Sequence, residues 1–141
     1  MRLVRHLLEE KGGSVVAISP DDTVLEAIKV MAEKSVGALL VLDGDTLVGI
    51  VSERDYARKV ILRGRASDST RVRDIMTSEL ITARSDDSVR KCMNTMTEHR
   101  IRHLPVVDEE LSGIISIGDL VAAIIADQQE EIAQLEQYIS S

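Results

Sequence analysis

The feature that most constrains the fold of this chain is an internal repeat. The segment from Asp21 to Asp55 aligns with the segment from Asp86 to Asp119, with one residue deleted in the second copy. Repeated units of this kind pack on one another to bury a common core. Each copy has roughly half the length of an ordinary domain and is too small to bury both faces of a sheet alone. We therefore expect the two copies to pack about a pseudo-twofold axis, with two related clefts between them.

Each copy has the same order of predicted elements. A short strand begins at Ser14 in the first copy and at Leu80 in the second. An Asp-Asp-Thr or Asp-Asp-Ser triplet follows, and its hydroxyl residue is suited to cap the next helix. The helices keep an apolar face at i, i+4 and i+7 spacing. These positions are Val24, Ile28 and Met31 in the first copy and Val89, Met93 and Met96 in the second. Two strands joined by a tight acidic turn and a second helix complete each copy.

The sequence predicts an α/β protein made of two β-α-β-β-α repeats with flanking helices. The predicted segments are a short N-terminal helix (1–13), repeat 1 (14–66), a linker (67–77), repeat 2 (78–126) and a longer C-terminal helical extension (127–141). An apolar stripe follows the last helix: Ile124, Ile125, Ile132, Leu135 and Ile139. This stripe is longer than one repeat requires. We expect its outer part to pack on a partner subunit or on the N-terminal helix.

Composition excludes several classes of function. A net charge of −7, with two Tyr and no Trp or Phe, argues against a nucleic-acid-binding surface. Cys92 is the only cysteine, so the chain has no internal disulfide and no thiolate zinc site, which fits a reducing cytoplasm. No apolar run is long enough for a signal peptide or a membrane span. Arg100 and Arg102 lie between His99 and His103, which disfavours a metal site there, and neither Ser52 nor Ser116 lies in a Gly-x-Ser-x-Gly motif. We therefore expect a cytoplasmic protein without a metal, catalysis or a membrane partner.

A Ser-x-x-Asp motif recurs where a strand leads into a helix. Ser52 and Asp55 form the first motif, and Ser116 and Asp119 form the second. One interpretation is a capping box, in which the acid accepts a hydrogen bond from the N–H of the capping residue. The other is a ligand site, because the free N–H groups at a helix N-terminus and a carboxylate there are suited to polar ligands. The repeated spacing favours the ligand site, and capping remains the alternative.

The sequences "GALLVLD" and "RHLPVVD", followed by "GIVSERD" and "GIISIGD", resemble a tandem pair of cystathionine β-synthase-type (CBS) domains, or Bateman module. The resemblance covers about residues 14–126 and is to small stand-alone proteins of this family. It implies a non-catalytic sensor that binds AMP, ADP, ATP, NAD(H) or S-adenosylmethionine between the repeats. It implies no obligatory cofactor, and it favours a homodimer. The alternative is a ligand-free structural or adaptor dimer in which the motifs only cap helices.

The resemblance also implies roles for individual residues. Asp55 and Asp119 would hold ribose hydroxyls, with Ser52 and Ser116 nearby. Adenine would lie against Ile81 in the cleft of Asp55 and against Val16 in the cleft of Asp119.

Phosphate groups and the base require further residues. The resemblance implies Arg54, Arg102 and His103 as phosphate donors. The first copy has Gly37 and Ala38 where the second has Arg102 and His103. We expect two unequal sites, with an apolar wall for a base in the cleft of Asp119 formed by Val36, Gly37 and Ala38.

Overall fold

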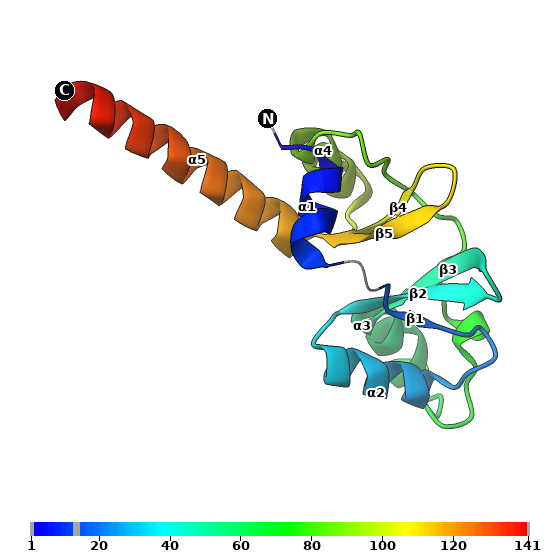
Figure 1. The fold of residues 1–141 in the computed structure, drawn as a ribbon. Helices are drawn as coiled ribbons and strands as arrows, with labels where there is room; N and C mark the ends of the chain where they lie inside the picture. Colours follow the sequence, from blue (N-terminus) through cyan, green and yellow to red (C-terminus); the bar gives the residue numbers. More distant parts are fainter. Residues whose placement is uncertain (1, 13–14, 141) are drawn as a thin grey trace. The chain divides into compact units, whose positions relative to one another are not determined.

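The computed structural model describes residues 2–12 and 15–140. It divides the chain into two compact units. The repeat-1 unit comprises residues 14–81, and the repeat-2 unit comprises residues 1–13 together with 82–141. The architecture is mixed α/β: the repeat-1 unit follows a β-α-β-β-α order, and the repeat-2 unit has the α-β-β-α part of it (Figure 1).

The repeat-1 unit is built on a three-stranded sheet of order β1-β2-β3. β1 runs parallel to β2, and β2 runs antiparallel to β3 with a register shift between Val41 and Leu42. Its elements are β1 (Ala17–Ile18), α2 (Val24–Lys34), β2 (Ala38–Asp43), β3 (Thr46–Ser52), α3 (Glu53–Tyr56), the π-helix η1 (Ala57–Ile61) and the 3₁₀ helix η2 (Val72–Asp74).

The repeat-2 unit has an antiparallel pair of strands, β4 and β5, with a register shift between Val106 and Val107. Its elements are α1 (Val4–Lys11), α4 (Val89–His99), β4 (His103–Val107), β5 (Leu111–Ser116) and α5 (Ile117–Ser140). The equivalent register shift in both hairpins confirms that the two copies share one structural plan.

The short strand predicted from Leu80 is reduced to a single parallel bridge between Ala83 and Val106. In the repeat-1 unit, the N–H of Leu40 donates to the carbonyl of Val16 at 3.3 Å. Alignment of the copies places Pro105 at the position of Leu40, and proline has no N–H to donate. The missing donor accounts for the shorter ladder in the second copy.

Both central helices begin where the sequence predicts. The hydroxyl of Thr23 accepts from the N–H of Glu26 at 3.2 Å, and the hydroxyl of Ser88 accepts from the N–H of Lys91 at 3.1 Å. Each hydroxyl satisfies one of the free donors in the first turn. The helices end at Ser35 and Arg100, the two described non-glycine residues with positive φ.

The apolar faces of these helices build the core of each unit. Val24, Met31, Val89 and Met96 are buried, as the periodicity predicts, and Cys92 is buried beside them on α4. The core of the repeat-1 unit consists of Ile18, Val24, Ala27, Met31, Leu39, Val41, Val51, Val60, Val72 and Ile75.

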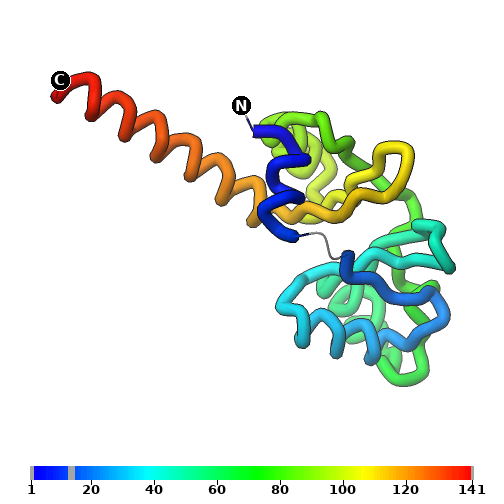
Figure 2. The backbone as a smooth tube through the Cα atoms, in the orientation of Figure 1, coloured from blue at the N-terminus to red at the C-terminus, as the bar shows by residue number. Residues whose placement is uncertain are grey.

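Helix α1 packs on the second copy of the repeat, far from it in sequence. The N–H of Val4 donates to the carbonyl of Asp87 at 2.9 Å, and the N–H of Val89 donates to the carbonyl of Arg2 at 3.2 Å. Val4 is fully buried. Figure 2 shows this blue segment beside the yellow strands and the orange start of α5.

The segment at residues 70–76 makes the equivalent contacts in the repeat-1 unit. The N–H of Val24 donates to the carbonyl of Thr70 at 2.8 Å, and the N–H of Val72 donates to the carbonyl of Asp22 at 2.9 Å. Val72 is fully buried. The segment that precedes each copy in sequence therefore packs on the other copy. Among the described residues, no helix is both long and apolar enough to cross a membrane.

Candidate functional site

The first Ser-x-x-Asp motif lies where β3 ends and α3 begins. The N–H of Ser52 donates to Oδ2 of Asp55 at 3.0 Å, and the N–H of Asp55 donates to Oγ of Ser52 at 3.2 Å. The Ser52 hydroxyl also donates to Oδ2 of Asp55 at 3.1 Å. This arrangement is a closed capping box. Asp55 is one of two buried polar or charged residues among those described, with 9% of its surface exposed.

A lysine on the same helical segment neutralises this buried carboxylate. Nζ of Lys59 lies 3.1 Å from Oδ1 of Asp55 and donates to the carbonyl of Ile75 at 2.8 Å. The hydroxyl of Thr77 lies 3.5 Å from the same carboxylate oxygen. Asp55 therefore joins β3, α3 and the segment that packs on this unit from residues 70–77.

The second motif has the same geometry at the end of β5 and the start of α5. The N–H of Ser116 donates to Oδ2 of Asp119 at 2.8 Å, and the N–H of Asp119 donates to Oγ of Ser116 at 3.1 Å. Reciprocal capping bonds therefore form in both copies, even though aspartate is shorter than the glutamate usual in this motif.

The cation beside Asp119 comes from α1. Nζ of Lys11 lies 2.8 Å from Oδ2 of Asp119 and donates to the carbonyl of Ile114 at 3.0 Å. Partial burial raises the pKa of Asp119, but the hydrogen bonds from Lys11 and Ser116 and the Lys11 charge outweigh it, so the pKa lies below its ordinary value. The carboxylate is therefore ionised at neutral pH.

A small cavity of about 240 Å³ adjoins this ion pair within the repeat-2 unit. Alanine side chains and charged groups share its lining: Arg2, Leu7, Glu10, Lys11, Asp119, Ala122, Ala123 and Ala126. The Lys11–Asp119 ion pair therefore borders this cavity.

Two predicted site residues flank the first motif. Gly37 accepts a hydrogen bond from the N–H of Glu53 at 3.1 Å, and Ala38 pairs with Ser52 across β2 and β3. The structure therefore gathers Gly37, Ala38, Ser52 and Asp55 in the repeat-1 unit.

The equivalent positions beside the second motif are basic. Arg102 accepts a hydrogen bond from the N–H of Ile117 at 2.8 Å, and His103 pairs with Ser116 across β4 and β5. The predicted equivalence of Gly37-Ala38 and Arg102-His103 is thus reproduced by the backbone contacts. The flank of the second motif carries hydrogen-bond donors that the first lacks.

The other candidate residues also lie in the repeat-1 unit. Val16 accepts from Leu40 at the sheet edge, and Arg54 is exposed on α3. Val36 and Ile81 are half-buried. The expected grouping of Val16 and of Val36, Gly37 and Ala38 with Asp119 joins the two units and remains a prediction, as does adenine contact at Ile81.

Gly49 and Gly113 permit close approach to their strands, and side chains of the chain itself occupy the space. A Cβ on Gly49 would lie 2.7 Å from Sδ of Met76 and 3.0 Å from the carbonyl oxygen of Thr77. A Cβ on Gly113 would lie 2.9 Å from Cδ2 of Leu8. These glycines therefore admit the segments exchanged between the two copies.

Sequence reasoning missed both lysines that contact the aspartates. Lys59 follows Asp55 by four residues on a helical segment, a spacing that brings side chains together and could have identified it. Lys11 lies 108 residues from Asp119, and no local pattern links the two.

Cys92 does not belong to either motif. Burial raises the pKa of its thiol to about 11, so it is protonated at neutral pH. Within residues 2–12 and 15–140, no group of three or more His, Cys, Asp or Glu side chains is placed to hold a metal ion.

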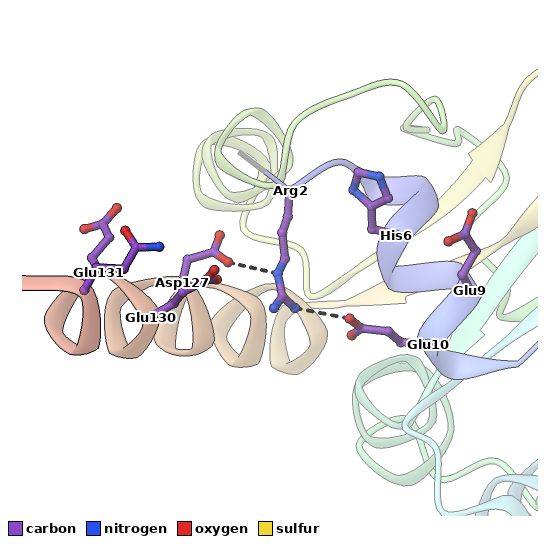
Figure 3. Close-up of a pocket in the computed structure, with 8 residues that line it drawn as sticks. Arg2, His6, Glu9, Glu10, Asp127, Glu130 and Glu131 are labelled. Atoms are coloured by element: carbon purple, nitrogen blue, oxygen red, sulfur yellow. Dashed lines mark hydrogen bonds and ion pairs between the residues drawn. The ribbon is translucent and has the colours of Figure 1, made fainter. Parts of the chain in front are cut away.

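A larger groove of about 710 Å³ lies between α1 and α5 (Figure 3). Arg2 crosses it and contacts Glu10 at 3.2 Å and Asp127 at 2.9 Å. The remaining lining is mainly acidic: His6, Glu9, Glu130, Glu131 and Gln134. These contacts connect α1 to the first half of α5.

Comparisons with known proteins place the chain among CBS proteins. The family model for the CBS domain matches residues 12–62 and 72–126. The mitochondrial CBS domain-containing protein CBSX3 of Arabidopsis thaliana is 43% identical over 146 residues, which cover 96% of this chain and 71% of that protein. A putative signal-transduction protein with CBS domains from Burkholderia ambifaria has 51% identity and a TM-score of 0.87, covering 90% of this chain and 96% of that one.

A second similar structure contains bound ligands. The CBS domain pair of protein MJ0100, in complex with 5'-methylthioadenosine and S-adenosyl-L-methionine, has 25% identity and a TM-score of 0.80. The match covers 90% of this chain and 98% of that chain. With two copies of the family model matched over most of its length, this chain belongs to the CBS domain family, as a tandem pair of CBS repeats.

Proposed function

We propose that the protein is a non-catalytic regulatory module that binds an adenosine-containing ligand: AMP, ADP, ATP, NAD(H), S-adenosylmethionine or 5'-methylthioadenosine. The observation that carries this proposal is the recurrence of an ionisable carboxylate in the same strand-to-helix geometry in both copies. The adenosine compounds bound to the MJ0100 pair support the ligand class.

The chemistry of the two aspartates suits a ribose. A carboxylate accepts hydrogen bonds from two vicinal hydroxyls, and such charge-assisted bonds are stronger than neutral ones. Oδ2 of Asp119 accepts from Lys11 and Ser116. A ribose at this position must share or displace the Lys11 contact, which couples ligand binding to α1.

The two sites are proposed to differ in their treatment of phosphate. Arg102 and His103 flank Ser116, whereas Gly37 and Ala38 flank Ser52. A guanidinium and an imidazole attract phosphate oxygens. We expect a ligand that carries phosphate to depend on Arg102 and an uncharged nucleoside to depend on it less.

The proposed regulatory output acts on another protein, through a homodimer. A ligand changes that output only if it binds two states of the protein with different affinity. The cytoplasmic location predicted from the sequence stays a prediction, and the name of the Arabidopsis relative places that relative in mitochondria.

Calorimetry with the six ligands tests the proposal. The variants Asp55→Asn and Asp119→Asn keep an oxygen for the capping bond but remove the charge that favours ribose. Loss of a hydrogen bond to a charged group should weaken binding roughly tenfold to hundredfold. Asp45→Asn, in the exposed β2–β3 turn, is the matched control and should bind normally. Absence of binding by the wild type at millimolar ligand would contradict the proposal.

A structural or adaptor dimer is the second candidate, because both capping boxes are closed in the structure. This candidate assigns the aspartates to helix capping alone. It predicts no adenosine binding and a stability loss of about 1 kcal/mol when a capping bond is removed. Mass spectrometry of small molecules that copurify with the protein separates the two candidates.

A further inference from the structure

One face of α5 packs on its own unit. Leu120 and Ala123 are buried, and Asp127 contacts the guanidinium of Arg2, which lies just before α1. The groove in Figure 3 lies along this side of α5, where Glu130 and Glu131 line it. The side of α5 that contains Asp127 therefore faces the N-terminal segment of its own unit across this groove.

A different side of α5 carries a stripe of exposed apolar side chains. Its members are 43% to 81% exposed: Val121, Ile125, Ile132, Leu135 and Ile139. With Gln128 between them, these positions alternate by four and three residues, which is the a/d spacing of a coiled-coil seam. Every residue from 128 to 140 is exposed, and Figure 1 shows α5 running past α1 and α4 of its own unit.

A helix that projects in this way needs a partner for its apolar face. Most helix stability in proteins comes from tertiary packing of that face, and an unsupported stretch of about 12 to 15 residues is marginal in water. An exposed a/d stripe fits another helix with the same spacing. A second copy of the chain supplies such a helix.

We propose that α5 pairs with α5 of a second copy as an antiparallel two-stranded coiled coil over residues 121–139. This inference specifies the surface of the proposed homodimer. In its register, Ile125 faces Leu135 of the second copy, and Val121 faces Ile139 of the second copy. Gln128 faces Ile132 of the second copy and is the polar position in the seam.

The charges beside the seam decide the direction of pairing. Antiparallel pairing places Glu136 opposite Ala122 and brings Glu131 against its own copy once. It also places Ile124 against Tyr138. Parallel pairing would instead place Glu131 opposite Glu136 twice, and like charges at such positions are destabilising. The dipoles of two antiparallel helices attract each other, which also favours antiparallel pairing.

Sedimentation equilibrium of the full chain tests the pairing. Ile132→Asp places a charge in the seam and should weaken self-association by roughly a hundredfold or more, since a charge cannot be buried there without a partner. Gln137→Asp adds the same charge on the far side of α5 and should leave self-association unchanged. Circular dichroism checks that both variants stay folded. Equal self-association of Ile132→Asp and the wild type would overturn the proposal.

Cysteine cross-linking tests the direction. In a Cys92→Ala background, Glu131→Cys should form a disulfide with its own copy on mild oxidation. Leu135→Cys should not, because the antiparallel register separates the two copies of this residue by roughly 15 Å along the axis, beyond the reach of a disulfide. Efficient cross-linking through Leu135→Cys without cross-linking through Glu131→Cys would overturn the antiparallel arrangement.

Ligand calorimetry on the same variants keeps this proposal separate from the proposed function. A wild type that dimerises through α5 but binds no adenosine compound would overturn only the proposed function. A wild type that binds such a compound but is unaffected in self-association by Ile132→Asp would overturn only the pairing.

Discussion

The two copies of the repeat hold equivalent aspartates with lysines from different places. Asp55 contacts Lys59, four residues further along the same helical segment. Asp119 contacts Lys11, which belongs to α1. Both lysines also donate to a backbone carbonyl, at Ile75 in one unit and Ile114 in the other. The same local chemistry is thus produced once by a neighbouring residue and once by a distant one.

Alignment of the copies shows that neither lysine is duplicated. The position of Lys59 in the first copy corresponds to Ala123 in the second, and the position of Lys11 corresponds to Glu79. A change at Asp55 is therefore felt inside the repeat-1 unit, through Lys59. A change at Asp119 is transmitted to the amino-terminal segment, which packs on β5 through α1 and contacts Asp127 of α5 through Arg2. The second site is the one connected to α5 and its proposed partner surface.

The largest expected effect concerns the segments exchanged between the copies. Leu7 and Ile75 occupy equivalent buried positions in the two units. Replacing either by Ala should lower the free energy of unfolding by about 2–5 kcal/mol, as for other large-to-small core changes. Hydrogen exchange should accelerate in residues 82–140 for Leu7→Ala and in residues 15–81 for Ile75→Ala. Faster hydrogen exchange confined to the residues next to Leu7 in sequence would contradict the packing of this segment on the second copy.

The aspartates themselves should differ in their contribution to stability. Asp55→Ala leaves the N–H of Ser52 without its acceptor and removes the buried carboxylate that pairs with Lys59, which should cost about 2–3 kcal/mol. The side chain of Asp119 is 25% exposed, so water can replace it more easily, and Asp119→Ala should cost about 1–2 kcal/mol. Urea unfolding measures both. A larger loss for Asp119→Ala would show that the α1 contact is the stronger one.

The elements of the fold were predictable from the sequence because they depend on local patterns. Apolar spacing and a hydroxyl cap located α2 and α4, and alternating residues around an acidic turn located both hairpins. The strand expected from Leu80 was wrong in length, since Pro105 removes the donor that β1 uses in the other copy. That loss could also have been deduced from the alignment of the copies.

The site was predictable only in part. The repeated Ser-x-x-Asp indicated both aspartates, and alignment indicated the unequal flanks at Gly37-Ala38 and Arg102-His103. The packing of the amino-terminal segment on the second copy has no local sequence signal, because it depends on contacts between distant residues, such as the backbone hydrogen bond between Val4 and Asp87. The contact between Lys11 and Asp119 follows from that exchange and was missed for the same reason.

The two lysines offer a smaller and more selective test. Lys59→Met should cost about 1 kcal/mol, because its carboxylate partner is buried, whereas Lys11→Met should cost less, as exposed ion pairs do. Hydrogen exchange should nevertheless accelerate within α1 only for Lys11→Met. Unchanged exchange in α1 would show that Lys11 does not help to hold this helix, and would weaken the connection between Asp119 and α5.

The smallest expected effect is the pH dependence of the Asp119 contribution. The pKa of Asp119 is lowered in the folded protein, because the contacts with Lys11 and Ser116 outweigh the effect of burial. A lowered pKa means that the folded state binds this proton less readily than the unfolded chain does. The stabilisation is therefore complete above the unfolded pKa of about 3.9 and is lost as the pH falls through the lower, folded value.

Urea titrations between pH 6 and pH 3 measure this dependence as the stability difference between the wild type and Asp119→Asn. The difference should be constant in the upper part of this range and shrink below about pH 4. In a Lys11→Met background the shrinkage should be weaker, because the ammonium that favours the carboxylate is gone. A dependence that Lys11→Met leaves unchanged would assign the lowered pKa to the capping bonds alone, and the two copies would then hold their aspartates by the same local means.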